Sequence, residues 1–188
     1  MRLFVAVTPP QEVLAELESV VAPLRQAWPE LRWQPPHRWH VTLAFLGEVQ
    51  DAKLDQLATR LERAAARHPC QRLRIEAGGA FPNPARARVV ITRIGAAGDA
   101  LAPLAASVAA GARRAGAPPP DEGRKYRPHL TLARTREPAD LTALVESLAN
   151  YEGNTWQSTQ IELIRSFTGP APRYEALAAW PLKAPTTA

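Results

Sequence analysis

The 188-residue sequence is poor in the residues that would mark several protein classes. Its single cysteine, Cys70, excludes an intramolecular disulfide and a cysteine-based metal cluster, and it fits a reducing compartment. The apolar run from Leu3 to Val7 is too short for the hydrophobic region of a signal peptide. No segment reaches the roughly 18 apolar residues of a membrane span. We therefore expect a cytoplasmic protein that does not enter a membrane.

Lysine is scarce too, since 20 of the 23 basic residues are arginine. With 18 acidic residues they give a formal net charge of +5. A basic balance of this kind favours a partner rich in phosphate or in other anionic groups. A coding bias that also inflates alanine and proline would produce the same numbers, so composition leaves both explanations open.

The remaining composition is that of one folded domain, with 46% hydrophobic and 22% charged residues. Apolar runs and alternation predict strands at residues 3–7, 31–34, 40–46, 72–77, 88–94, 129–135, 155–166 and 173–180. Apolar residues at helical spacing predict helices at residues 9–28, 51–67, 98–115 and 139–149. Residues 183–188 are predicted to form a flexible tail.

A duplicated motif organises these elements. The segment His40–Ala44 reads HVTLA, and the segment His129–Ala133, 89 residues later, reads HLTLA. Each is followed by an amphipathic helix and then by strands, and two copies are too few for a solenoid. We therefore predict an α+β fold in which residues 1–182 form one bilobal domain about a pseudo-two-fold axis. Each lobe should be an antiparallel sheet with helices on its outer face, and a cleft should lie between the lobes.

The two-residue period of a strand predicts on which face each motif side chain lies. Residues i and i+2 share a face, so His40 and Thr42 point to one side while Val41 points into the core. The same holds for His129 and Thr131. One such motif would be an ordinary exposed strand face, but two copies, each preceded by a proline-containing turn, indicate a function. They predict two imidazoles and two hydroxyls around one pocket.

The paired motifs resemble those of the 2H phosphoesterases, in particular the RNA 2′,3′-cyclic phosphodiesterases, also called 2′-5′ RNA ligases. The resemblance covers most of the chain, through MRLFVAV, HVTLAFLGEV, FPNP, RPHLTLAR, IELIRS and PRYEALAAWPL. It departs at Trp39, where relatives often carry an aliphatic residue, and at Phe167-Thr168, where they often carry an acidic and an aliphatic one. The resemblance implies hydrolysis of RNA cyclic phosphate ends to 2′-phosphates without a metal or other cofactor, and a reversible 2′-5′ ligation.

The motif residues suit this chemistry on their own. Opening a cyclic phosphodiester requires a base for the attacking water and an acid for the departing ribose oxygen, and two histidines of pKa about 6.5 supply both. The hydroxyls of Thr42 and Thr131 can hydrogen-bond the phosphate oxygens, and Arg134 offers a guanidinium for their charge. Strict alternation turns Arg134 away from the His129 face. Its contact with phosphate therefore requires a bulge or a side chain that reaches round the strand end.

The division of roles comes from the resemblance alone. It implies that His40 donates a proton to the leaving O3′ and that His129 activates water, whereas two nearly equivalent lobes give no physical reason for either order. It also implies that Phe45 stacks on the nucleobase. A core aromatic at the end of a strand is the other interpretation of Phe45.

Two further groups of residues carry weaker signals. His37 and His40 have the spacing H-x-x-H, but no carboxylate or cysteine completes a zinc site, so we expect no metal. Arg124, Lys125 and Arg127 precede the second motif, where they either contact an RNA backbone or lie in a solvated loop.

Three functions remain open at this point. The first is hydrolysis of RNA ends that carry a 2′,3′-cyclic phosphate, by a monomeric enzyme. The second is hydrolysis of a small cyclic nucleotide or of ADP-ribose cyclic phosphate. The third is RNA binding without catalysis, against which the intact histidine and threonine of both motifs argue.

Overall fold

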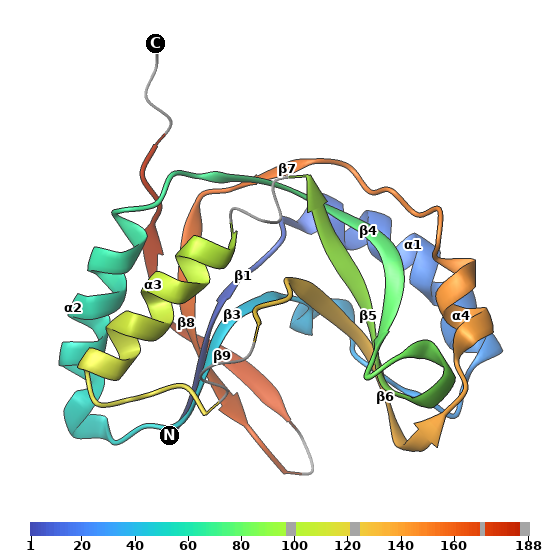
Figure 1. Ribbon diagram of the computed structural model, residues 1–188, viewed down its shortest axis with the longest axis horizontal. Coiled ribbons are helices and arrows are strands. Elements are labelled where there is room, and N and C mark those ends of the chain that lie inside the picture. Colours follow the sequence, from blue (N-terminus) through green and yellow to red (C-terminus); the bar gives the residue numbers. More distant parts are fainter. Residues whose placement is uncertain (97–100, 121–124, 170–171, 185–188) are drawn as a thin grey trace.

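The predicted strands join one curled antiparallel sheet (Figure 1). The computed structural model describes residues 1–96, 101–120, 125–169 and 172–184. Within these ranges nine strands follow the order β7-β4-β5-β6-β3-β1-β8-β9, with β2 paired to β6. The strands are β1 (Arg2–Val7), β2 (Arg32–Trp33), β3 (Val41–Glu48), β4 (Gln71–Phe81), β5 (Ala87–Ala96), β6 (His129–Ala139), β7 (Trp156–Ser158), β8 (Gln160–Phe167) and β9 (Arg173–Pro181).

The α+β fold class and the two-lobed arrangement are confirmed. One half of the sheet consists of β3, β1, β8 and β9, and the other half consists of β6, β5, β4 and β7. The motif strands β3 and β6 meet at the junction, where Val41 pairs with Leu130. The two lobes therefore share a continuous sheet, and the pseudo-two-fold axis passes between the motif strands.

Four helices accompany the sheet in the described part of the chain: α1 (Gln11–Ala27), α2 (Leu54–Ala65), α3 (Leu101–Arg114) and α4 (Thr142–Ser147). Helices α2 and α3 pack together and contact β9 and β3, whereas α1 and α4 lie toward the other half, where α4 contacts β4 (Figure 1). One core holds buried side chains of every helix and of both motif strands, among them Leu17, Leu57, Leu104, Leu144, Val41 and Leu130. The alternate residues of the motif strands therefore face away from this core. None of the described helices is both long and apolar enough to cross a lipid bilayer.

The glycine pair Gly78-Gly79 lies inside β4, although the sequence predicts a loop from residue 78. Gly78 is buried, and a Cβ atom at this position would lie 2.9 Å from Cβ of Leu148 and 2.9 Å from the carbonyl oxygen of Val145. The glycine allows the strand and the segment of α4 to approach closely, which is a role that glycine takes in strands as well as in turns.

The predicted strand at 155–166 is divided at Thr159, because its two parts belong to opposite halves of the sheet. β7 pairs with β4, and β8 pairs with β1. The same two edges approach again at an isolated bridge between Pro69 and Lys183. The sheet therefore curls far enough to bring its edges together at one end. Lys183, predicted to begin a flexible tail, exchanges backbone hydrogen bonds with His68 and Cys70, so the structured chain extends at least to this residue.

Candidate active site

Pairing of the two motif strands brings the motif side chains together. β3 and β6 run antiparallel and pair through the residue that follows each motif histidine, Val41 and Leu130. Continued on both sides, this register sets each motif histidine opposite the threonine of the other motif, on one face of the sheet. All four motif side chains are half-buried. Both motifs therefore lie at the junction of the two halves of the sheet.

A β-bulge follows each motif. The register of β3 with β1 shifts by one residue at Leu43, and the register of β6 with β5 shifts by one residue at Leu132. Each bulge places two buried residues in succession, so the third residue after the threonine returns to the face of the histidines. That residue is Phe45 in one lobe and Arg134 in the other, and both are exposed. The bulge that a role for Arg134 requires is therefore present.

The two imidazoles are held in the same way. Nδ1 of His40 lies 2.8 Å from the carbonyl oxygen of Arg38, and Nδ1 of His129 lies 2.7 Å from the carbonyl oxygen of Arg127. Because a carbonyl oxygen only accepts hydrogen bonds, Nδ1 carries the hydrogen and donates it. Nε2 is then the ring atom left for chemistry, as an acceptor in the neutral ring and as a donor in the imidazolium.

Aromatic rings pack against both histidines. The ring centroid of Phe4 lies 4.7 Å from that of His40, and Tyr174 makes an edge contact with His40 at 5.4 Å. Phe81 makes an edge contact with His129 at 5.0 Å. Sequence reasoning missed all three, because they come from β1, β9 and β4, whose placement beside the motif strands no sequence pattern shows.

Burial makes both histidines more acidic than a free imidazole. It lowers the pKa of His40 from 6.5 to about 4, and a positive charge on His129 adds to this lowering. Burial also lowers the pKa of His129, and the charge of Arg134 contributes to this lowering. The two imidazoles and the guanidinium are therefore close enough for their charges to interact.

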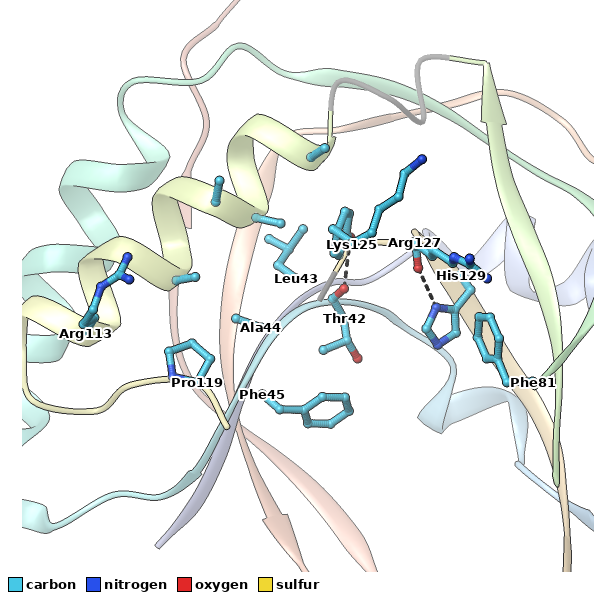
Figure 2. A pocket seen from close by; sticks show the side chains of 15 residues that line it. Thr42, Leu43, Ala44, Phe45, Phe81, Arg113, Pro119, Lys125, Arg127 and His129 are labelled. Atoms are coloured by element: carbon cyan, nitrogen blue, oxygen red, sulfur yellow. Dashed lines mark hydrogen bonds between the residues drawn. The ribbon is translucent and has the colours of Figure 1, made fainter. Parts of the chain in front are cut away.

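A cleft of about 890 Å³ opens beside the motif strands (Figure 2). Thr42, Phe45 and His129 line this cleft, so three of the predicted site residues share its wall. Phe45 is 44% exposed, so its interpretation as a core aromatic is wrong. His40 lines a second, smaller pocket of about 210 Å³ together with Tyr174.

The segment before the second motif borders the same cleft. Lys125 and Arg127 line it with exposed side chains, whereas Arg124 lies outside the described residues. Between them the hydroxyl of Tyr126 donates a hydrogen bond of 3.0 Å to the carbonyl oxygen of Thr42, and burial raises the pKa of this tyrosine. This hydrogen bond joins the segment that precedes the second motif to strand β3, which carries the first motif. Nothing in the sequence singles out Tyr126 for this contact.

The other candidates occupy ordinary positions. His37 is exposed, and Cys70 is a half-buried free thiol. Over residues 1–96, 101–120, 125–169 and 172–184, no three histidine, cysteine, aspartate or glutamate side chains are grouped as ligands of one metal ion.

Similarity to known proteins agrees with this geometry. The family model described as LigT like Phosphoesterase matches residues 7–91 and 94–174. A Thermus thermophilus protein named RNA 2′,3′-cyclic phosphodiesterase is 32% identical over 191 residues, which cover 97% of this chain and 91% of the relative.

Solved structures match over almost the full length. A crystal structure of a Thermus thermophilus protein has a TM-score of 0.77 at 31% identity and covers 98% of this chain and 99% of its own. The E. coli LigT complex with 3′-AMP has a TM-score of 0.70 at 26% identity and covers 96% of both chains. The family model matches both halves of the chain, and the structure contains the two His-x-Thr motifs on one shared sheet. This chain therefore belongs to the LigT-like phosphoesterases, which are enzymes of the 2H phosphoesterase family that its motifs resemble.

Proposed function

We propose that the protein hydrolyses RNA ends that carry a 2′,3′-cyclic phosphate and leaves a 2′-phosphate, without a metal ion. The observation that carries the proposal is the pair of imidazoles on adjacent strands, each with Nδ1 bound to a backbone carbonyl and Nε2 left for proton transfer. Two such groups supply one acid and one base to a single displacement. The name of the Thermus relative and the 3′-AMP bound by E. coli LigT support a nucleotide substrate.

In the proposed reaction, water attacks phosphorus in line with the bond to O3′. Nε2 of His129 takes a proton from the water as its oxygen bonds to phosphorus. Nε2 of His40 gives a proton to O3′ as the bond between phosphorus and O3′ breaks. The products are a 2′-phosphate and a free 3′-hydroxyl, and the two histidines return to their starting states by exchange of one proton with solvent.

The remaining site residues act on the phosphate and the base. The threonine hydroxyls of both motifs donate hydrogen bonds to the non-bridging oxygens, and the guanidinium of Arg134 balances the charge that grows there. The exposed ring of Phe45 takes the nucleobase by stacking, which tolerates every base. Reverse 2′-5′ ligation uses the same groups in the opposite direction and stays a prediction, as do the cytoplasmic location and the monomeric state.

Burial opposes the acid role of His40 in the free protein, where its pKa is about 4. A phosphodiester carries a negative charge, and an opposite charge within about 4–6 Å raises the pKa of a histidine by roughly 1 to 3. We therefore propose that the substrate itself promotes protonation of His40. The protein then holds an active acid mainly when the cyclic phosphate is bound.

The pH dependence of hydrolysis follows from these pKa shifts. At a pH below both lowered pKa values both histidines are protonated and no base remains, whereas at a pH above both values both are neutral and no acid remains. We expect a bell-shaped profile of kcat/KM with its optimum on the acid side of pH 6.5, the unperturbed histidine value. The optimum of kcat should lie at higher pH, because bound phosphate raises both pKa values. Initial rates measured from about pH 4 to 9 check this, and two coinciding optima above pH 7 would contradict it.

Metal independence has a direct test. The purified protein should hydrolyse a 2′,3′-cyclic phosphate oligonucleotide in excess EDTA at the same rate as in buffer, because proton transfer by two histidines needs no Lewis acid. Chromatography of the product distinguishes the 2′-phosphate from the 3′-phosphate. Loss of activity on chelation, restored by one added metal ion, would falsify the metal-free proposal.

A further inference from the structure

The influences on the two motif histidines come in matching pairs, with one exception. Burial lowers the pKa of both rings, and both donate Nδ1–H to a backbone carbonyl. An arginine charge disfavours each imidazolium, from Arg38 at His40 and from Arg134 at His129. The exception is the carboxylate of Glu162 on β8, which opposes the effect of burial on His40, whereas no carboxylate of the described residues does so at His129.

Glu162 is held beside His40 by hydrogen bonds to both of its carboxylate oxygens. Oε2 accepts one of 2.6 Å from the hydroxyl of Thr8, and Oε1 accepts one of 3.0 Å from the side-chain amide of Gln160. Both Glu162 and His40 are half-buried, and both line the pocket of about 210 Å³. The other ionisable groups that face this histidine from the described residues include no carboxylate: His37, Arg38, His129 and Tyr174. Glu162 is therefore the negative charge on the His40 side of the site.

Strand pairing shows how near the carboxylate lies to the imidazole. The pairing of Val7 with Val41, continued by one residue, sets Thr8 opposite His40. Directly opposite residues of an antiparallel pair have Cβ atoms about 4.5 to 5.5 Å apart. The hydroxyl of Thr8 in turn contacts the carboxylate of Glu162. One threonine thus separates the two groups, which is close enough for their charges to interact in a half-buried site.

The other lobe has no carboxylate at the equivalent position of the sheet. The row of paired residues that starts at Thr42 crosses β1 and reaches Glu162 on β8. The corresponding row from Thr131 crosses β5 and reaches Gly79 on β4. A Cβ atom at Gly79 would lie 3.8 Å from Nε of Arg93, which pairs with the second motif histidine. The lobes therefore place charges of opposite sign beside their histidines.

We propose that Glu162 is the positioning residue that makes His40 the acid, because its carboxylate stabilises the imidazolium on that side of the reacting phosphate. The assignment rests on the proposed hydrolysis of RNA ends. In that reaction the charge of the phosphodiester acts on both histidines, so it does not select between them. Glu162 supplies a physical reason for the division of roles that the two matching motifs lack. It acts through His40 and takes up no proton itself.

The test replaces Glu162 with glutamine, which keeps an oxygen for the hydroxyl of Thr8 and removes the charge. Glu162→Gln should lower kcat/KM for a cyclic-ended oligonucleotide by about threefold to tenfold, as expected when the pKa of His40 falls by up to about one. It should not change the rate on a substrate in which sulfur replaces O3′, because a thiolate departs without a proton. Glu162→Asp, which keeps the charge, should retain most of the rate on both substrates.

The matched control is Glu175→Gln, which removes an exposed carboxylate of the neighbouring strand β9 that lines neither pocket. It should change neither rate. A second readout needs no hydrolysis, since nuclear magnetic resonance of the histidine ring protons reports the pKa of each ring. Glu162→Gln should lower the pKa of His40 and leave that of His129 in place, whereas Glu175→Gln should move neither.

The outcomes separate the role of Glu162 from the proposed reaction. Equal losses of Glu162→Gln on the oxygen and sulfur substrates, or an unchanged pKa of His40, would overturn the role and leave the hydrolysis in place. If the unmodified protein hydrolyses neither substrate, the proposed function fails. The titration then still decides whether the carboxylate stabilises the imidazolium of His40.

Discussion

Alanine in place of either motif histidine is expected to lower kcat/KM for a cyclic-ended oligonucleotide by about 10² to 10⁴. In the proposed reaction His40 and His129 act in one displacement, so removal of the second histidine should cost little once the first is gone. The double variant is expected within about tenfold of the weaker single variant. Initial-rate kinetics on the three variants measure this directly.

The control is His68→Ala, which removes the same kind of side chain away from the site. The ring of His68 forms a hydrogen bond of 2.7 Å with the hydroxyl of Ser107 and lines neither of the two pockets. It should retain activity close to that of the unmodified protein. Thermal unfolding of each variant, followed by circular dichroism, shows whether the motif variants keep their fold. Losses that multiply in the double variant would mean that the two histidines act in separate steps.

A substrate with sulfur at the 3′ position should rescue the variant that lacks the acid. A thiolate departs without a proton, so His40→Ala, if it lacks only the acid, should recover from a loss of about 10² to 10⁴ to within about tenfold of the unmodified protein. His129→Ala should stay slow on the same substrate, because the attacking water still needs a base.

The opposite pattern has a physical basis in the burial of the two rings. Burial lowers the pKa of His40 to about 4, which opposes its protonation before substrate binds. Rescue of His129→Ala by the thio substrate would show that His129 is the acid and that the roles are reversed. The product is a linked check, since departure of O3′ must leave a 2′-phosphate.

Most of the fold could be predicted from local patterns, because alternating and helical apolar spacing give the identity of each long element. The predicted element boundaries are wrong where contacts between residues distant in the sequence determine the local structure. The sequence around Gly78 predicts a turn, but Gly78 lies in a strand that packs closely against α4. Thr159 separates two strands because the sheet curls until its edges meet, so the residues before and after Thr159 pair with opposite halves of the sheet. Neither contact leaves a local signal.

The site was predictable to the extent that it repeats. The two copies identify His40 and Thr42 and their counterparts, since strand period gives their shared face. The rings of Phe4 and Tyr174 were not predictable, because single aromatic residues on β1 and β9 carry no sign of the partner they meet. The sequence indicates that a role for Arg134 needs a bulge, but it does not show where the bulges lie, because they appear only in the register between paired strands.

The two bulges also bear on which product isomer forms. Rotation of the cyclic phosphate by half a turn about the pseudo-two-fold axis exchanges O2′ and O3′ between the two histidines. A site with two identical halves would bind both orientations equally well and would release a mixture of isomers. The bulges present an aromatic ring, Phe45, on one side and a guanidinium, Arg134, on the other, so the two orientations differ in free energy. We propose that Phe45 and Arg134, rather than the histidines and threonines that the two copies share, determine the regiochemistry of ring opening in the proposed reaction.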